Sequence, residues 1–365
     1  LLSLFINLKN IKFIKKFFFT IILISIIIFN SNRFPFYNYI YDFGYYHNGY
    51  INWLNQSNMV IGLANIHPSY GYTGNSFLLG SFLNVFPILN NGYIFTVSIF
   101  FIFFIFFSIS EIKNTDDIFL KAYLIFSFYV ILKYIFEEPL GDYSPYKINL
   151  IFYLYFFYIF FNFLKFNEEK NLIFIKIIFL IAIMISFSPV SWIFSFLIIL
   201  FLIFNDKNLL KQKLILLPIL FLFLFFLLNF LKSGHILYPL QINLFVPDYA
   251  VSIDFLYDIK NFPKKYLPGF EWIIPWFKSS FLQNSFCVVY SFLLLFFVFL
   301  CLFNQIRNNE KFLFVFLSLT FLNLSIIFWF FNSPDIKTGK IFFWSGIIII
   351  TSFIYSSLYS RIEIF

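Results

Sequence analysis

The sequence predicts an all-α polytopic membrane protein with about ten transmembrane helices in one domain, residues 1–365. Hydrophobic residues make up 61% of the chain and charged residues 12%, whereas soluble globular domains average about 25% charged residues. A soluble domain with so little charge could not cover its surface with polar groups. Apolar runs long enough to cross the roughly 30 Å hydrocarbon layer also recur along the whole chain.

The order of these apolar runs gives the individual spans. The expected spans are 17–30, 93–110, 118–135, 148–164, 171–187, 189–204, 214–231, 286–303, 312–331 and 341–358. A further apolar segment, 76–89, is short for a span and ends near Pro87. We expect this segment to lie along the outer face as an interfacial helix.

The distribution of lysine and arginine predicts the orientation. If 76–89 does not cross, the Lys-rich loop 205–213 and both termini are cytoplasmic, as the positive-inside rule requires. Lysines before the run 17–30 resemble the start of a signal peptide, but no small-x-small cleavage site follows, so we expect an uncleaved anchor. This topology leaves four outer regions, 31–92, 136–147, 232–285 and 332–340.

The charge distribution and the cysteine and histidine spacing argue against several features. The formal net charge is +8, but lysines and arginines stand singly or in small groups at helix ends, which argues against a nucleic-acid partner. Cys287 and Cys301 fall about four turns apart in one predicted helix and cannot bridge each other. No Cys/His cluster has the spacing of a zinc site.

The first outer region carries the densest polar chemistry. Asp42, just beyond the first apolar run, is a candidate general base because a carboxylate backed by aromatic residues would have a raised pKa. The alternative is that Asp42 caps a short helix over 44–55. The loop that follows offers hydrogen-bonding groups for a ligand. They are His47, His67, Tyr70 and Asn75. The alternative for His67 is a loop histidine whose partners are purely structural.

The other outer regions contain acidic and basic candidates. Glu137, Glu138 and Asp142 lie close together and could hold a divalent cation that bridges a phosphate, or form a solvated loop. Lys232 and His235 lie just beyond an apolar run and could hold a lipid-linked phosphate, or could simply mark a helix end.

Short motifs spread over most of the chain resemble known membrane proteins. The order of an acid after the first helix, a horizontal helix and a Gly/Asn/His-rich loop resembles the GT-C superfamily of integral-membrane glycosyltransferases, which includes aminoarabinose transferases and protein O-mannosyltransferases. The blocks YDFGYYHNGYINWL, SGHILYP with VPDY, and WFFNSPDIKTGK are similar to blocks of one bacterial integral-membrane family. They include Tyr238 and Asp335.

The resemblance implies a GT-C fold, with Asp42 at the catalytic acid/base position and Asp142 as the second loop acid. Two features depart from the pattern. Phe43 stands where these transferases commonly have a second acid, and His67-Pro68-Ser69 replaces a Lys-Pro-Pro segment.

The expected function is therefore transfer of a sugar from a polyprenyl-phosphate donor to a cell-envelope glycan or lipid, at the outer face of a bacterial inner membrane. Asp42 would act as base and Asp142 as second acid. Lys232 and His235 would neutralise the phosphate, while His47, His67, Tyr70, Asn75, Tyr238 and Asp335 would contact substrate. Whether a divalent cation held by Glu138 and Asp142 takes part is open. The alternatives are a polymerase-like or flippase-like protein, or a non-catalytic scaffold that binds lipid-linked glycan.

Overall fold

The computed structural model is mainly helical over the part of the chain that it describes, and that part contains no strand. It describes residues 20, 24–31, 47–57, 59–71, 74–84, 92–138, 140–141, 144–165, 170–205, 212–238, 247–252, 270–302, 312–332 and 335–362. The all-α expectation is thereby confirmed.

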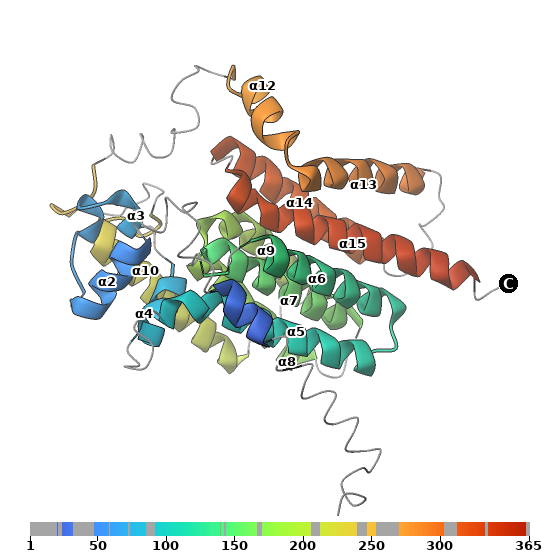
Figure 1. The fold of residues 1–365 in the computed structure, drawn as a ribbon, viewed down its shortest axis with the longest axis horizontal. Helices are drawn as coiled ribbons and strands as arrows, with labels where there is room; N and C mark the ends of the chain where they lie inside the picture. The colour runs from blue at the N-terminus through green and yellow to red at the C-terminus, as the bar shows by residue number, and fades with distance from the viewer. Residues whose placement is uncertain are drawn as a thin grey trace, which may run out of the picture.

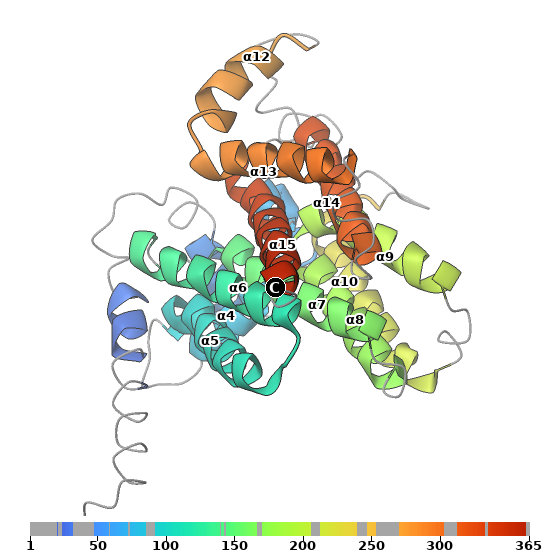
Figure 2. The ribbon, with the colours of Figure 1, turned by 90° about the vertical axis from the view of Figure 1, so that its right-hand side faces the viewer.

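Long apolar helices form a bundle that runs horizontally in Figure 1. Its members are α5 (Thr96–Asn114), α6 (Ile118–Glu137), α7 (Pro145–Lys165), α8 (Lys170–Phe187), α9 (Trp192–Asn205), α10 (Leu216–Ser233), α13 (Ser285–Leu302), α14 (Phe312–Asn332) and α15 (Ile336–Ile362). Figure 2 looks nearly along α15 and shows this helix in the middle of the bundle. There it contacts α6, α7, α13 and α14. Its apolar residues from Ile347 to Ile350 are all buried, as expected for a helix surrounded by others.

Six of the described helices are long and apolar enough to cross a membrane. They correspond to the expected spans 93–110, 118–135, 148–164, 214–231, 312–331 and 341–358. The helices for 171–187 and 189–204 are shorter, and the helix for 286–303 follows a bend of 102°. Most of the run 17–30 lies outside the described residues. The count of ten spans therefore stays a prediction.

The bent helix pair consists of α12 (Ile273–Trp276) with a π-helical turn (Phe277–Phe281), followed by α13. Figure 1 shows α12 rising away from the bundle, while α13 lies against it. Trp276 packs its ring on Phe330 and Trp329 of α14 at 4.9 and 5.9 Å between ring centroids. The pair is therefore anchored to α14 through Trp276 before it bends into α13.

A layer of short helices lies over one end of the bundle, at the left of Figure 1. It comprises α2 (Asn48–Gln56), the 3₁₀ turn η4 (Leu63–Asn65), α3 (Pro68–Gly71) and α4 (Ser76–Asn84). These helices share a small hydrophobic core of their own around Tyr50, Ile51, Leu63, Tyr70 and Phe77. We call this end of the bundle the covered end.

The short helix α4 does not cross the bundle. At its start, the Asn75 backbone N–H donates to the Ser186 carbonyl at the end of α8, at 3.0 Å. After its end, the Tyr93 backbone N–H, just before α5, donates to the Asn84 side chain at 3.0 Å. Nine residues of helix are also only about 14 Å long. Both ends of α4 thus lie at the covered end, as the interfacial interpretation of 76–89 requires.

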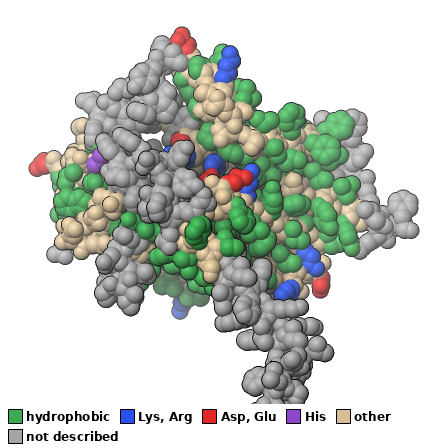
Figure 3. Space-filling view, in the orientation of Figure 1, with side chains coloured by type: hydrophobic (Ala, Val, Ile, Leu, Met, Phe, Trp, Pro, Cys, Tyr) green, Lys and Arg blue, Asp and Glu red, His purple; other side chains and the backbone are tan. Residues whose placement is uncertain are grey.

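Hydrophobic side chains dominate the visible surface of the bundle. Figure 3 shows a mostly hydrophobic surface over the right-hand part of the view, while acidic and basic side chains gather toward its middle. Helix α10 is the most exposed of the six spanning helices, with 22% of its apolar window buried. Large apolar side chains that face a bilayer explain such exposure without any cost of hydration.

Candidate functional site

The end of α10 is held in place by loops from distant parts of the chain. The Gly62 backbone N–H donates to the Leu231 carbonyl at 2.9 Å, and the Val251 N–H donates to the Ser233 carbonyl at 3.0 Å. Gly234 closes the helix with a φ of 75°, a left-handed conformation that favours glycine. These bonds satisfy carbonyls that a buried helix end would otherwise leave without donors.

Lys232 lies in the last turn of this helix and is 7% exposed. Its Nζ donates to the Tyr50 hydroxyl at 3.1 Å and lies 5.4 Å from the centre of the Tyr50 ring. Tyr70 stacks on Tyr50 at 5.8 Å, and Phe77 meets it edge-on at 5.6 Å. Lysine is almost never fully buried unless it is paired. Here the Tyr50 hydroxyl and the Tyr50 ring both contact the Lys232 ammonium group.

Lys232 and Tyr50 line a cavity of about 220 Å³ between the covering layer and α10. Trp53 comes from α2, Asn75 precedes α4, and Phe225 lies two turns before Lys232 on α10. The lining is mainly apolar, and its polar groups are the cation, a phenol, an amide, the Ser57 hydroxyl and the Trp53 indole N–H. Small-molecule sites in proteins typically have a few polar groups on an otherwise apolar wall. We call this space the Lys232 cavity.

The neighbouring surface of α10 is open and apolar. Exposed side chains along it include Leu217, Leu220, Phe223, Leu224 and Leu227, with exposed fractions of 41–60%. Phe225 and Leu228 of the same helix line the cavity. The Lys232 cavity therefore lies beside an apolar helix face that is suited to contact with lipid.

His47, His67 and Tyr70 lie behind the cavity rather than on its wall. His47 is 5% exposed and packs edge-on against Phe77 at 5.1 Å. His67 packs on Tyr70 at 5.4 Å. Partial burial lowers the pKa of His67, which favours the neutral ring. The Ser69 backbone N–H donates to Nδ1 of His67 at 3.2 Å, so the neutral ring carries its proton on Nε2.

His235 and Tyr238 hold the backbone of the covering layer. Nε2 of His235 lies 3.0 Å from the Val251 carbonyl, and the Tyr238 hydroxyl donates to the Pro68 carbonyl at 2.8 Å. Both side chains are buried. These contacts give them a positioning role, and their contact with a sugar stays a prediction.

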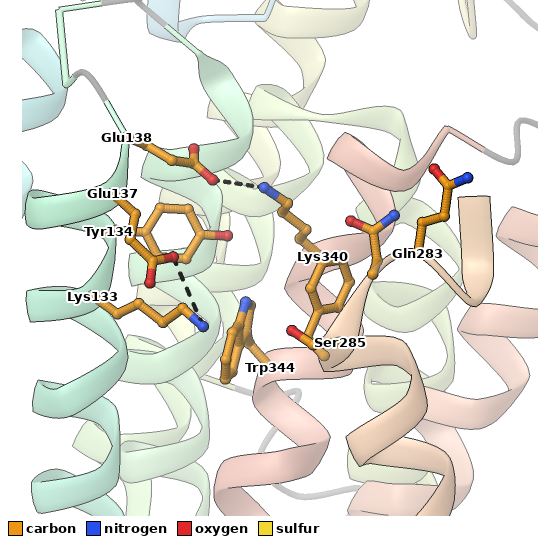
Figure 4. A pocket seen from close by; sticks show the side chains of 10 residues that line it. Lys133, Tyr134, Glu137, Glu138, Gln283, Ser285, Lys340 and Trp344 are labelled. Atoms are coloured by element: carbon orange, nitrogen blue, oxygen red, sulfur yellow. Dashed lines mark hydrogen bonds and ion pairs between the residues drawn. The ribbon is translucent and has the colours of Figure 1, made fainter. Parts of the chain in front are cut away.

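A separate group of charges lies where α6, α7 and α15 meet. Glu138 accepts from Lys340 at 2.6 Å and lies 3.4 Å from Lys147 (Figure 4 shows the Lys340 contact). Burial raises the pKa of the Glu138 carboxyl, but the two ammonium groups outweigh it, so the pKa lies below its usual value. Within the described residues, no three His, Cys, Asp or Glu side chains are grouped to hold a metal ion.

The remaining predicted site residues divide into two groups. Asp42 and Asp142 lie outside the described residues, so their predicted roles stay predictions. Asp335 is described and precedes α15, where its carboxylate accepts from the Lys337 backbone N–H at 3.1 Å. That contact gives it the role of a helix cap. The structure thus brings Lys232 and Asn75 to one cavity wall, with His47 and Tyr70 behind it.

Sequence reasoning missed Tyr50 and Trp53, which line the cavity on α2. A signal was available, because Tyr50, Trp53 and Leu54 lie at helical spacing in NGYINWLNQ. Their role in the cavity could not be predicted from this segment, because Lys232, the partner of Tyr50, lies 182 residues further along the chain.

The fold and the apolar helices define the chain as a helical membrane protein. A family model described as a domain of unknown function (DUF8201) matches residues 1–344, so the chain belongs to that family. Neither a curated protein nor a solved structure matches the chain.

Proposed function

We propose that the protein is a membrane glycosyltransferase that moves a sugar from a polyprenyl-phosphate donor to a cell-envelope glycan or lipid. Its site would be the Lys232 cavity, at the outer face of a bacterial inner membrane. The observation that carries the proposal is the buried ammonium of Lys232 in an aromatic cavity beside an exposed apolar face of α10.

A lipid-linked phosphate needs both a cation and an apolar surface, and the Lys232 cavity with the exposed face of α10 offers both. The phosphate needs a cation at the edge of the hydrocarbon layer, where a charge-assisted hydrogen bond is strong. The polyprenyl chain needs an apolar surface that faces lipid. Lys232 offers the cation, and the exposed leucines of α10 offer the surface.

The aromatic and amide groups of the cavity fit a sugar placed next to that phosphate. Trp53 and Tyr50 present ring surfaces, while Asn75 can both donate and accept hydrogen bonds. In the proposed reaction, Asp42 takes the proton of the acceptor hydroxyl as the oxygen attacks the anomeric carbon. The bond from that carbon to the phosphate oxygen breaks, and Lys232 stabilises the departing phosphate anion.

The test is sugar transfer by the full chain in proteoliposomes that contain a labelled polyprenyl-phosphate sugar and a cell-envelope extract as acceptor. Asp42→Asn keeps the shape of the side chain and any helix cap, but it removes the proton acceptor. We expect transfer to fall by about 10²–10⁴-fold, the usual contribution of general-base catalysis, with unchanged thermal stability.

Lysine variants provide the matched comparison in the same assay. Lys232→Met removes the cation and should abolish transfer, whereas Lys278→Met, at an exposed lysine outside the cavity, should leave it unchanged. If Asp42→Asn transfers sugar at the wild-type rate, Asp42 has no part in the mechanism. If wild-type protein binds the donor but never transfers its sugar, the scaffold alternative replaces the proposal.

A further inference from the structure

A second pocket, of about 200 Å³, lies where α6, α13 and α15 meet at the covered end. Figure 4 shows Lys133, Tyr134, Glu137 and Glu138 on one side, with Ser285, Lys340 and Trp344 facing them. None of its lining residues also lines the Lys232 cavity. Glu137 and Glu138, predicted from the sequence as candidate ligands of a divalent cation, line this pocket, but the function proposed for the Lys232 cavity does not use it.

The charged side chains that line this pocket are two lysines and two glutamates. Lys340 bonds Glu138 at 2.6 Å, and Lys133 lies 3.8 Å from Glu137. Lys147 lies 3.4 Å from Glu138 on its other side, but it is buried and does not line the pocket. A phosphate placed here would meet two carboxylates as well as two ammonium groups, and the repulsion offsets the attraction. An apolar ligand would leave these polar groups without water, which is costly. The pocket is therefore suited to a neutral, polar ligand.

The hydrogen-bonding groups of the pocket alternate between donors and acceptors. In Figure 4 the indole nitrogen of Trp344 points into the space between Lys133 and Lys340. Phe286 packs 6.0 Å from the Trp344 ring and the Lys133 ammonium 5.1 Å from it, which fixes the ring. The exposed hydroxyl of Ser285 can donate and accept, and the carboxylates accept. A ligand with several hydroxyl groups pointing in different directions can satisfy this lining, because each hydroxyl both donates and accepts.

The size of the pocket limits the ligand further. Its volume of about 200 Å³ lies below the roughly 300–1,000 Å³ of pockets for drug-sized ligands. That is the space of a single small ring with its substituents. We propose that this pocket binds a neutral monosaccharide unit, through the Trp344 indole N–H, the Ser285 hydroxyl and the paired Lys133 and Glu137 side chains. This inference does not rest on the function proposed for the Lys232 cavity.

The test is binding of free sugars to the purified full chain in detergent. The probes are glucose, galactose and N-acetylglucosamine, with inorganic phosphate as the comparison, measured by saturation-transfer NMR and calorimetric titration. We expect saturable binding of at least one sugar by the wild-type protein, and no binding of phosphate by the Lys232→Met protein, which lacks the cation of the other cavity. Trp344→Phe removes the indole N–H but keeps a ring, and it should raise the sugar Kd at least about tenfold, a loss of about 1.4 kcal/mol.

Three further variants make the result specific to this pocket. Trp192→Phe is the matched control, because that indole bonds the Ile185 carbonyl elsewhere in the bundle, and it should leave the Kd unchanged. Ser285→Trp at an exposed position should fill the pocket and abolish binding, even if Trp344→Phe fails to fold. Lys232→Met should leave the Kd unchanged. Absence of binding by all three sugars, or loss with Lys232→Met but not with Ser285→Trp, would overturn the proposal.

Discussion

Glu138 shows how a single side chain ties three helices together at the covered end. It follows α6, and its carboxylate faces Lys147 of α7 and Lys340 of α15. Lys147 is 5% exposed and Glu138 31%. Removing one partner of a buried ion pair costs about 3–5 kcal/mol, whereas exposed pairs contribute about 0–1 kcal/mol. This partly exposed group falls between these limits.

Glu138→Gln should therefore lower the free energy of unfolding by about 2 kcal/mol near neutral pH. The folded-state pKa of Glu138 lies below its unfolded value, so the carboxylate stabilises the fold above the unfolded pKa of about 4.5. That stabilisation is lost as pH falls through the lower, folded-state pKa. Thermal unfolding in detergent across pH 3–7 should show the gap between wild type and variant closing in acid.

Glu271→Gln, at an exposed glutamate near α12, is the matched control and should follow the wild-type pH curve. A gap between wild type and Glu138→Gln that stays constant down to pH 3 would show that the Lys147–Glu138–Lys340 contacts do not carry this stability.

At the residue scale, the sequence predicted the types of group but not their partners. Lys232 was recognised as a candidate cation because it follows an apolar run, and the structure places it in a cavity. Glu138 was predicted as a candidate metal ligand, and the structure pairs it with two lysines. Lys147 and Lys340 lie 9 and 202 residues from it, and only tertiary packing brings Lys340 near.

At the scale of elements, Gly74 sets how closely the covering layer approaches the bundle. A Cβ at this position would lie 2.5 Å from the Ser186 carbonyl oxygen and 2.8 Å from that of Phe187. Both atoms belong to the backbone at the end of α8, so they cannot move aside as a side chain could. The adjacent bond from Asn75 to Ser186 depends on this approach.

Gly74→Ala should push the layer away from α8 and destabilise the protein by about 1–3 kcal/mol, the usual cost of overpacking. Because Asn75 lines the Lys232 cavity, the variant should also weaken binding there. Thermal unfolding and limited proteolysis of the loop before α4 would measure both effects. An alanine variant with wild-type stability would show that the contact at Ser186 is looser than the structure indicates.

The short elements were harder to predict than the long ones. Long apolar runs reveal spanning helices by length alone, and six of them were found where expected. The segment 76–89 was ambiguous in hydropathy, and the charge distribution favoured a non-crossing helix. The bend of 102° lies between Phe281 and Ser285 and was missed, because 273–281 was assigned to the outer region 232–285, where no helix was expected.

At the scale of the whole molecule, lysines mark the end of the bundle opposite the covered end. Lys113 lies at the end of α5, Lys165 ends α7, Lys170 begins α8, and Lys213 precedes α10. Lysines also lie at the covered end, but Lys133, Lys147 and Lys340 are paired there with Glu137 or Glu138. The positive-inside rule therefore still predicts that the opposite end is cytoplasmic and that the covered end faces outside.

Reporter fusions test this orientation directly. A fusion after Gly92 should give an outside signal, because α4 returns to the covered end before α5 begins, whereas a fusion after Lys213 should give a cytoplasmic signal. Alkaline phosphatase and a fluorescent protein that matures only in the cytoplasm report the two sides. A cytoplasmic signal at Gly92 would place the Lys232 cavity on the wrong face for an outward-facing transferase.

The central claim is that the Lys232 cavity holds the phosphate of a polyprenyl lipid. The most direct test is native mass spectrometry of the purified chain with undecaprenyl phosphate, comparing wild type with Lys232→Met and Lys278→Met. We expect the wild-type protein and Lys278→Met to retain the lipid. Lys232→Met should retain it at least about tenfold more weakly, because a charge-assisted hydrogen bond contributes about 1.5–3 kcal/mol. Equal retention by all three proteins would contradict the central claim.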